Sequence, residues 1–440
     1  MKYYLFIFIL LAAIPSMAQY DLSLYNMRHI PQVVNTNPAI MPLGRLNISI
    51  PFLGSIYGQL GKSDFDVDVT SVDDQGTLRV DVDKFINGLS DENLVYAGTS
   101  VEDLHVGFTA GKNYIFITAT DKVSAQFQFP KEAAIFITEV FDQVGIPGYT
   151  NIPDLKLNGS HHREIGLGWS RKLNEKWSAG ARVKVLSGIS SIKTNTSGIV
   201  IDGVSGDDLT GLVNVDVQTS GIEEYVKDPL LTLSGFQNWG YSLDFGVEFK
   251  PMPKIKVAAS VIDLMGTIKW TENVKNYQAD SVRVDFNTVG WGNIFNPNGE
   301  GTGFSDFIDS IVSNTEPALV NAPYTTQVPT KILGSFTYYI TPKIEATLVG
   351  QGAFTSDYFQ PYLRIGIQGR FKRFLNYMVS YSIIDDQVSS TNLGVGLAVN
   401  IGPVQIHALT DNIFDPFLFT SDFNPSLRFG INLTFGRDNE

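Results

Sequence analysis

From about residue 240 to its end, the chain repeats one pattern, in which roughly ten residues alternate apolar with polar or small side chains and a short turn follows. Successive side chains of a β-strand point to opposite faces, so each of these segments has one apolar face and one polar face. The alternation is clear at 239–250, 361–371, 391–400 and 425–436. An apolar outside around a polar inside is the arrangement of a transmembrane β-barrel, and this is the fold class that we predict.

The first eighteen residues are typical of an export signal. Lys2 precedes an apolar stretch over 5–14, and the small residues Ser16 and Ala18 lie where a signal peptidase cleaves. That stretch is shorter than the ~20 residues that a membrane-spanning helix needs. We therefore expect residues 1–18 to be a signal peptide and the mature chain to begin at Gln19.

Composition excludes several kinds of function. The chain has no Cys and only five His, so disulfides, thiolate metal sites and cysteine nucleophiles are absent. A formal net charge of -13 argues against a nucleic-acid partner, because a polyanion needs a basic face. No P-loop, Gly-x-Ser-x-Gly or His-Glu-x-x-His motif occurs. We expect no enzymatic activity, no cofactor and no metal site.

The pattern predicts fourteen strands, an even number, as in bacterial single-chain barrels. Their ranges are 45–52, 103–111, 113–121, 161–172, 176–187, 239–250, 254–263, 331–340, 343–352, 361–371, 374–384, 391–400, 403–410 and 425–436. Short and long connections alternate, which indicates that short turns lie at the periplasmic rim and long loops outside. We therefore predict an outer-membrane protein of a Gram-negative bacterium with both chain ends in the periplasm.

Three segments do not fit simple strands. Residues 19–44 contain Asn37, Pro38 and two further prolines, and we predict that this segment is a plug inside the barrel formed by 45–440. Lys131 to Val144 has apolar side chains at helical spacing, which predicts a short helix on the outer side. The segment 292–317 is rich in Gly, Asn and Pro and is predicted to be an outer loop.

Charged residues occupy the inner face of the predicted barrel. A Lys or Arg on the lipid face near the midplane would cost ~2 to 4 kcal/mol, so both signs of charge are expected to pair across the lumen or with the plug. The candidate lumen and plug residues are Asn37, Pro38, Arg182, Asp244, Glu248, Arg364, Arg370 and Arg428. At the outer rim the candidates are Asp263, Trp270, Asp411 and Asn412. There Trp270 is expected to be an interface aromatic and Asp263 to hold a turn.

Three short motifs carry a family resemblance: Asn37-Pro38-Ala39, the stretch from Asp263-Leu264-Met265-Gly266 to Trp270, and Gly402-Pro403-Val404-Gln405 followed by Thr410-Asp411-Asn412. The chain resembles uncharacterised outer-membrane barrels of Bacteroidota, themselves similar to PorV and PorP/SprF of the type IX secretion and gliding system. It is more remotely similar to the long-chain fatty-acid transporter (FadL) family. The resemblance implies a fourteen-stranded barrel with an N-terminal segment in the lumen.

Two functions remain open at this point. A transporter of a hydrophobic small molecule predicts a continuous apolar pocket in the outer half of the lumen, reachable through a gap in the wall, and a sealed lumen with paired charges would exclude it. A docking protein for a secretion or surface partner would use the long loops 53–102, 188–238 and 264–330, and a purely scaffolding role is a third possibility. The main alternative fold is a secreted soluble β-sandwich or propeller, which would bury the apolar faces against another sheet.

Overall fold

The computed structural model describes residues 22–25, 27–62, 70–72, 78–80, 82–142, 150–153, 155–205, 208–227, 236–285, 318–354, 359–384, 392–414 and 424–436. The signal peptide predicted at 1–18 and the loop predicted at 292–317 lie outside these residues. No helix within the described ranges is both long enough and apolar enough to cross a bilayer.

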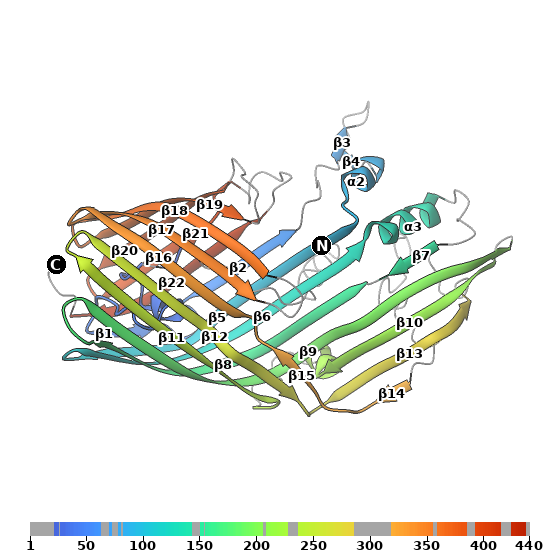
Figure 1. Ribbon diagram of the computed structural model, residues 1–440, viewed down its shortest axis with the longest axis horizontal. Coiled ribbons are helices and arrows are strands. Elements are labelled where there is room, and N and C mark those ends of the chain that lie inside the picture. Colours follow the sequence, from blue (N-terminus) through green and yellow to red (C-terminus); the bar gives the residue numbers. More distant parts are fainter. Residues whose placement is uncertain are drawn as a thin grey trace.

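A closed antiparallel barrel with fourteen strand positions forms the body of the molecule (Figure 1), which confirms the predicted fold and strand number. In order around the wall the strands are β1 (Leu46–Ser49) with β2 (Ile56–Lys62), β5 (Glu92–Ala110), β6 (Asn113–Pro130), β8 (Lys156–Lys172), β9 (Trp177–Ser205), β11 (Trp239–Met252), β12 (Ile255–Trp270), β15 (Tyr324–Gln327) with β16 (Thr330–Thr341), β17 (Ile344–Phe354), β18 (Phe359–Phe371), β19 (Leu375–Ile384), β20 (Leu393–Ile401), β21 (Val404–Thr410) and β22 (Ser426–Phe435). The last strand, β22, pairs with β1 and β2 and closes the ring.

The wall places its apolar side chains outside and its polar ones inside. Outward-facing Leu167, Ile365 and Leu427 are 63%, 61% and 52% exposed, whereas inward-facing Arg182 and Asp244 are buried. A charged interior under an apolar exterior is stable only if lipid surrounds the barrel, which makes this a transmembrane barrel and excludes the soluble sandwich.

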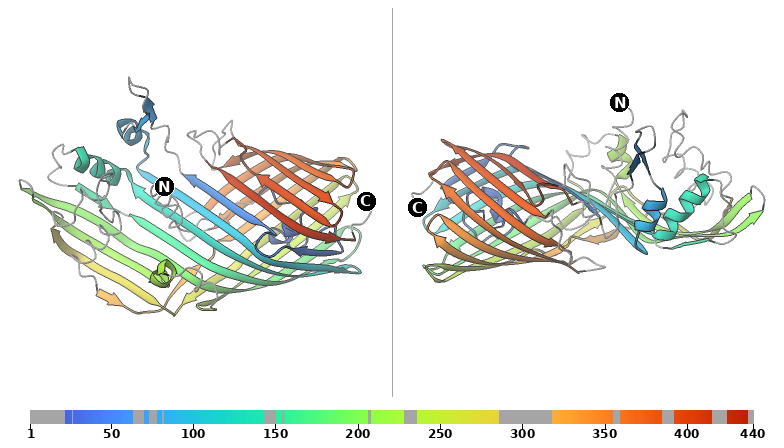
Figure 2. Two further views of the ribbon diagram at one scale, coloured as in Figure 1. Left: turned by 180° about the vertical axis from the view of Figure 1, so that it is seen from behind. Right: turned by 90° about the horizontal axis from the view of Figure 1, so that it is seen from above.

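Six short turns lie together at one end of the barrel, at the left of Figure 1. Gly111 and Gly402 have φ of 61° and 58° in two of these turns, a conformation that glycine adopts without strain. The opposite end differs, because β5, β6, β8 and β9 continue far beyond the barrel as an open sheet (Figure 2). We call the first end the short-turn end and the extension the outer sheet.

Four further strands and three helices belong to the outer region: β7 (Thr150–Pro153), β10 (Asp208–Ser220), β13 (Val274–Asp285), β14 (Ala318–Val320), α2 (Val82–Gly88), α3 (Lys131–Asp142) and α4 (Ile222–Lys227). There β9 pairs with β10, β10 with β13 and β13 with β14. A separate hairpin consists of β3 (Thr70–Val72) and β4 (Leu78–Val80). The helix predicted at 131–144 is confirmed as α3.

The segments predicted as long loops therefore contain much regular structure, which corrects their description as loops. Half of β5 lies within 53–102, and the hairpin of β9 and β10 lies within 188–238. Beyond the membrane neither face of a strand needs to be apolar, so the alternation that identifies the barrel strands fades there. The strand ends predicted from that alternation coincide with the end of the lipid-facing belt rather than with the end of the strand.

Candidate functional site: the plugged lumen

The N-terminal segment 22–43, with residue 26 not described, lies inside the barrel; we call it the plug. It folds as successive tight turns, in which the N–H groups of Tyr25, Met27 and Ile30 donate to carbonyls three residues earlier, followed by the 3-10 turn η1 (Pro31–Asn35). Its apolar side chains are almost fully buried, namely Leu22, Leu24, Tyr25, Met27, Ile30, Val33, Val34, Ile40 and Met41. Burial of this much apolar surface holds the segment against the inside of the wall.

Asn37 forms hydrogen bonds both within the plug and to the wall. Its Nδ2 donates to the Tyr25 hydroxyl at 3.1 Å and to the Ala259 carbonyl of β12 at 3.3 Å. Its Oδ1 accepts from the Ala39 N–H at 2.9 Å. The following Pro38 cannot donate a backbone hydrogen bond, so the Asn side chain supplies the local turn instead.

Two glycines of the wall allow this turn to lie directly on β9 and β11. A Cβ at Gly180 would lie 2.1 Å from the carbonyl oxygen of Pro38, and a Cβ at Gly246 would lie 2.0 Å from Oδ1 of Asn37. The Ser170 hydroxyl of β8 donates to the same Pro38 carbonyl. The close approach of plug and wall thus depends on the absence of side chains at these two positions.

A network of buried charges occupies the side of the lumen formed by β9, β11 and β12. Nε and Nη2 of Arg182 each lie 2.6 Å from Oδ2 of Asp244. Nζ of Lys184 lies 3.0 Å from Oδ1 of Asp244 and also pairs with Asp263. Arg182 donates in addition to Asn35 of the plug. All four charged side chains are at most 4% exposed, so each depends on its partners for charge compensation.

The network continues toward β6 and β8. Nζ of Lys122 lies 2.7 Å from Glu164 and 3.8 Å from Asp263, and Glu164 lies 3.7 Å from Lys184. Beside it is a polar cavity of about 70 Å³, whose lining includes Lys122, Glu164 and Lys331. That volume holds a few water molecules at most, so the charged side of the lumen is closed to larger solutes.

Plug side chains also form an ion pair or a hydrogen bond with wall carboxylates at two other places. Arg28 pairs with the buried Glu248, which has Lys256 3.7 Å away on its other side. Nε2 of Gln32 donates to Glu102 at 2.6 Å. With the plug in place these carboxylates are buried, so the contacts with Arg28 and Gln32 compensate for their lost hydration and help to hold the plug in the lumen.

Arg364 and Arg428 lie on the inside of β18 and β22. Nη2 of Arg364 donates to the Tyr25 carbonyl at 3.2 Å. The Arg428 guanidinium lies 4.8 Å from the centre of the Tyr57 ring and donates to the Ser55 hydroxyl. Both cations are therefore held by the plug or by the wall itself.

Next to the charge network, the outer half of the lumen contains an apolar cluster. Leu22 and Tyr25 of the plug pack there against wall residues of β5, β12 and β16 to β18, which are Tyr96, Ile262, Leu333, Val349, Ala353 and Tyr362. We call this set the luminal apolar pocket. Its chemistry suits an apolar molecule, and its present occupant is the plug.

The first strand is interrupted between β1 and β2, although backbone hydrogen bonds between Ile431 of β22 and both Ile50 and Leu53 keep the wall continuous there. Pro51 and Phe52 occupy this break, where Phe52 has a φ of 61° and is 61% exposed on the outside. From inside, Nε2 of Gln32 closes the break by donating to the Gly54 carbonyl at 3.3 Å. The first strand therefore contributes two short pieces to the wall, and a plug residue covers the junction between them.

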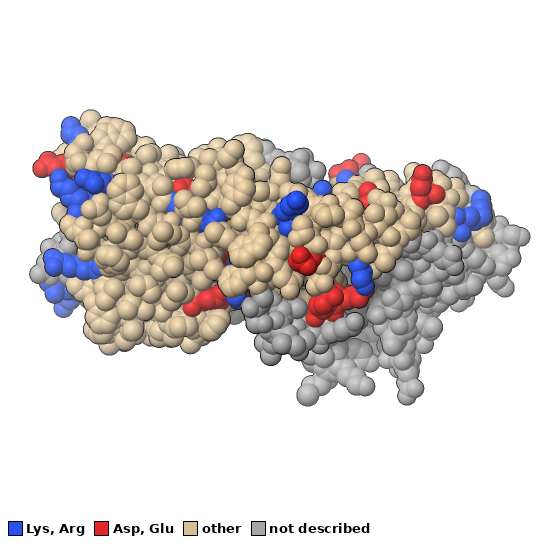
Figure 3. Space-filling view, turned by 90° about the horizontal axis from the view of Figure 1, so that it is seen from below, with Lys and Arg blue, Asp and Glu red and all other residues tan. Residues whose placement is uncertain are grey.

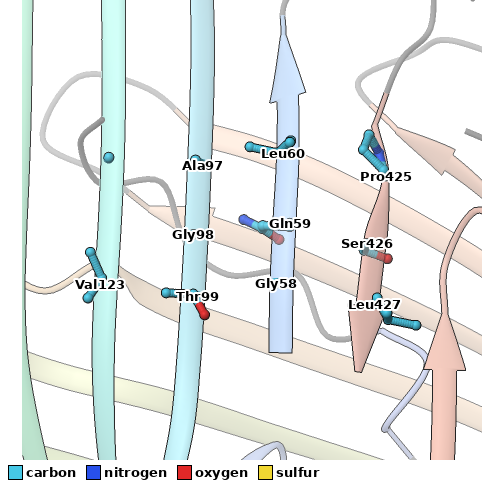
Figure 4. Close-up of a pocket in the computed structure, with 11 residues that line it drawn as sticks. Gly58, Gln59, Leu60, Ala97, Gly98, Thr99, Val123, Pro425, Ser426 and Leu427 are labelled. Carbon is cyan, nitrogen blue, oxygen red and sulfur yellow. The ribbon is translucent and has the colours of Figure 1, made fainter. Parts of the chain in front are cut away.

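The outside of the wall has an apolar groove of about 370 Å³ beside β2. Figure 4 shows its lining residues on β2, β5, β6 and β22. Its lining includes Gly58, Leu60, Ala97, Gly98, Val123 and Leu427. The small outward-facing residues Gly58, Ala97 and Ala125 leave the space that larger lipid-facing residues fill elsewhere on the barrel.

Six of the eight candidate lumen residues belong to the plug or contact the plug or the charge network, as the preceding distances show. Arg428 is held instead by the wall residues Tyr57 and Ser55, and Arg370 lies apart from the network. It lies at the short-turn end, where its Nη2 donates to the Pro342 carbonyl at 3.2 Å. Along β18 it is six residues, or three periods of the alternation, away from Arg364, too far toward the mouth to reach the central carboxylates.

Two of the outer-rim candidates differ from expectation. Asp263 lies at an irregularity within β12, with φ of 59°, and its carboxylate turns inward to Lys184 instead of holding a rim turn. Trp270 is fully buried and donates from Nε1 to Thr326 at 2.8 Å, so it is not exposed to the membrane interface. The reason is that β12 continues to Trp270 and is covered there by β15.

Asp411 and Asn412 follow the end of β21. Asp411 accepts from the hydroxyl of Ser23 in the plug, and its N–H donates to the Ser426 hydroxyl at 3.0 Å. Oδ1 of Asn412 accepts from the Phe414 N–H at 3.2 Å. These hydrogen bonds thus hold the chain that follows β21, and Asp411 connects it to Ser23 at the start of the plug.

Sequence reasoning missed Lys122, Glu102, Gln32 and the apolar pair Leu22 and Tyr25. Lys122 follows directly after the predicted end of its strand at 121, although polar residues continue to alternate beyond that point. The roles of the plug residues depend on contacts with strands hundreds of residues away, for which a single sequence has no local signal. Within the described ranges, no group of three or more His, Asp or Glu residues is placed to hold a metal ion.

Comparisons with known proteins give one family and several distant structures. No curated protein matches the chain. The Ralstonia pickettii toluene transporter TbuX has 10% sequence identity and a TM-score of 0.47, with 97% of each chain covered. A Pseudomonas aeruginosa FadL homologue has 8% identity and a TM-score of 0.44, with 93% of this chain and 94% of the other covered. Values this low do not assign a ligand.

The family described as "Family of unknown function (DUF5723)" matches residues 38–411. This range begins at Pro38 of the plug and ends at Asp411 after β21, so it includes the lumen network and nearly all of the barrel. The chain of 440 residues therefore belongs to the family of unknown function DUF5723.

Proposed function

We propose that the protein resides in the outer membrane of a Gram-negative bacterium, with the short-turn end and the end of the last strand, β22, on the periplasmic side. The described part of the chain begins at Leu22 in the outer half of the lumen, so the start of the plug does not lie at the periplasmic mouth. The apolar exterior with a charged interior supports insertion in a membrane. The gathering of six short turns at one end supports the orientation, because outer-membrane barrels have short periplasmic turns and longer outer connections.

Within that membrane, the function that we propose is the uptake of a hydrophobic small molecule into the luminal apolar pocket. The observation that carries this proposal is the occupation of the pocket by Leu22 and Tyr25, side chains of a non-covalently held plug. A hydrophobic molecule that replaces these two side chains would find the same apolar contacts. The paired charges beside this pocket close the axial path through the lumen, so uptake requires movement of the plug.

The double variant Leu22→Ala and Tyr25→Ala tests this proposal, because it removes the occupants and leaves the wall intact. We expect saturable binding of fluorobenzene, followed by 19F NMR on the protein in nanodiscs. Addition of Leu333→Glu to the double variant should abolish that binding, since a carboxylate in the pocket repels an apolar ligand.

A matched control is Leu24→Ala with Met27→Ala, which empties a different cluster formed with Met378, Ala398 and Leu409. If this pair creates the same binding as the first pair, the luminal apolar pocket has no special role. Absence of saturable binding in every variant would exclude the uptake proposal.

Docking of a secretion or surface partner, as in PorV-like proteins of the type IX system, is a second candidate function. It is favoured by the outer sheet, because β9 with 29 residues and the added strands β10, β13 and β14 far exceed what a membrane wall needs. Replacing residues 197–215 by Asn-Gly would shorten the hairpin of β9 and β10 and keep the Thr196–Asp216 pair. A docking role predicts loss of partner co-purification with an unchanged barrel, whereas unchanged co-purification would oppose it.

A further inference from the structure

The short-turn end of the barrel is basic, although the whole chain is acidic. Five of the six short turns contain a lysine, namely Lys112, Lys176, Lys254, Lys343 and Lys372. The acidic residue within these turns is Glu175. Figure 3 shows Lys and Arg gathered at this end, at the left of the view. Given a formal net charge of -13, this separation of charge along the molecule produces a local positive field at one mouth.

A cavity of about 740 Å³ opens in the middle of this basic end, between the plug and the turns. Its lining includes the basic side chains Arg28, His29, Lys250, Lys254, Lys343 and Arg370. Its one acidic lining residue, Glu345, is hydrogen-bonded by Gln368. The volume lies in the upper part of the range for small-molecule sites and far exceeds a single inorganic anion.

The direction of these basic groups distinguishes between possible anionic ligands. Lys250 and Arg370 occupy the same alternation positions as the inward-facing Glu248 and Gln368. Side chains that point into the mouth cannot reach the lipid headgroups around the barrel. Lys112, Lys176 and Lys372, in the turns at the perimeter of the short-turn end, lie close enough to the headgroups to contact them. A ligand from the aqueous compartment fits the inward groups, and the apolar lining residues Met27 and Leu43 add an apolar surface to the cavity.

We infer that the short-turn mouth binds an acidic peptide segment of a partner protein. Arg28 already pairs with Glu248. The basic groups come from three separate parts of the chain, the plug, the β11–β12 turn and the β16–β19 region, so a ligand with several negative charges spread along its length complements the charge of the cavity. The surrounding ring of turn lysines would attract such a partner to the mouth and align it end-on. This inference is independent of what the outer half of the lumen takes up.

The test uses the full-length mature protein in nanodiscs of zwitterionic lipid and a fluorescein-labelled octamer of aspartate, followed by fluorescence anisotropy. Two triple variants remove the same charge. The mouth variant is Lys250→Gln, Lys254→Gln and Arg370→Gln, and the rim variant is Lys112→Gln, Lys176→Gln and Lys372→Gln. We expect the mouth variant to bind the peptide at least tenfold more weakly and the rim variant less than threefold more weakly.

Equal losses in the two triple variants would mean general electrostatic attraction and would overturn the inference. The same holds if the wild-type protein shows no saturable binding at low salt, or if the rim variant loses more than the mouth variant, which would indicate a lipid-headgroup role for this end. Heat-modifiable gel migration of each variant verifies that the barrel is folded. Peptide binding retained by the Leu22→Ala and Tyr25→Ala variant would keep this site separate from the luminal apolar pocket.

Discussion

At the scale of single residues, the lumen depends on charges that compensate one another in the absence of water. Lys184 is the central member, because it lies within 4 Å of three carboxylates, those of Glu164, Asp244 and Asp263. Its own side chain is fully buried. Removal of one partner from such a cluster costs more than the loss of a surface ion pair, since the remaining charges stay desolvated.

We predict that Lys184→Met destabilises the folded barrel by about 3 kcal/mol, because Asp244 and Asp263 are left without their shared cation. Heat-modifiable gel migration over a temperature series measures the effect as a lower temperature of unfolding. Lys269→Met is the matched control, with the same chemical change at an exposed position of the same barrel. Equal stability of the two variants would contradict the prediction.

At the scale of elements, the strand pattern and the plug differ in how far the sequence predicts them. The alternation in β11, β18 and β22 is visible in the sequence, because lipid on one side and the lumen on the other require it along the whole strand. The outer halves of β5 and β9 escape prediction, since water on both sides removes that requirement. The plug is recognisable only as an irregular segment with Asn37 and Pro38, because the contacts that hold it in the lumen are with distant strands.

We predict that Gly246→Ala loosens the plug, because the new Cβ would lie 2.0 Å from Oδ1 of Asn37 and the two cannot coexist without displacement. A cysteine introduced by Ala39→Cys reports this, since the chain has no other cysteine and the Ala39 position is fully buried. Maleimide labelling of that cysteine should become at least tenfold faster.

The control for this experiment is Gly350→Ala, where the nearest atom to the added Cβ is 3.9 Å away. Labelling should stay slow in that variant. Fast labelling with Gly350→Ala, or slow labelling with Gly246→Ala, would mean that the contact between Asn37 and β11 does not hold the plug.

At the scale of the whole molecule, the two ends of the barrel differ in shape and charge. The short-turn end is compact and basic, and the other end continues into the outer sheet. This difference between the two ends is the basis for the proposed orientation of the barrel in the membrane. It also places the two proposed binding sites at different ends of the barrel. The luminal apolar pocket lies in the outer half, whereas the basic cavity lies at the short-turn mouth.

Single cysteines test the orientation in intact cells. With Asn195→Cys on the exposed part of β9, we expect labelling by a membrane-impermeant maleimide, because the outer sheet would face the medium. With Lys254→Cys in the turn between β11 and β12, we expect labelling only after the outer membrane is permeabilised. The reverse pattern would invert the proposed topology.

The barrel, its fourteen strands and the inward position of Arg182, Asp244 and Glu248 follow from the amino-acid pattern alone, because the boundary between lipid and lumen imposes period two on every wall strand. The partners of these charges, the inward turn of Asp263, the burial of Trp270 and the filling of the luminal apolar pocket by Leu22 and Tyr25 depend on the three-dimensional arrangement. Alternation specifies which face a side chain points to. Which residues that side chain contacts depends on the closed wall, because the wall brings strands that are far apart in the chain side by side.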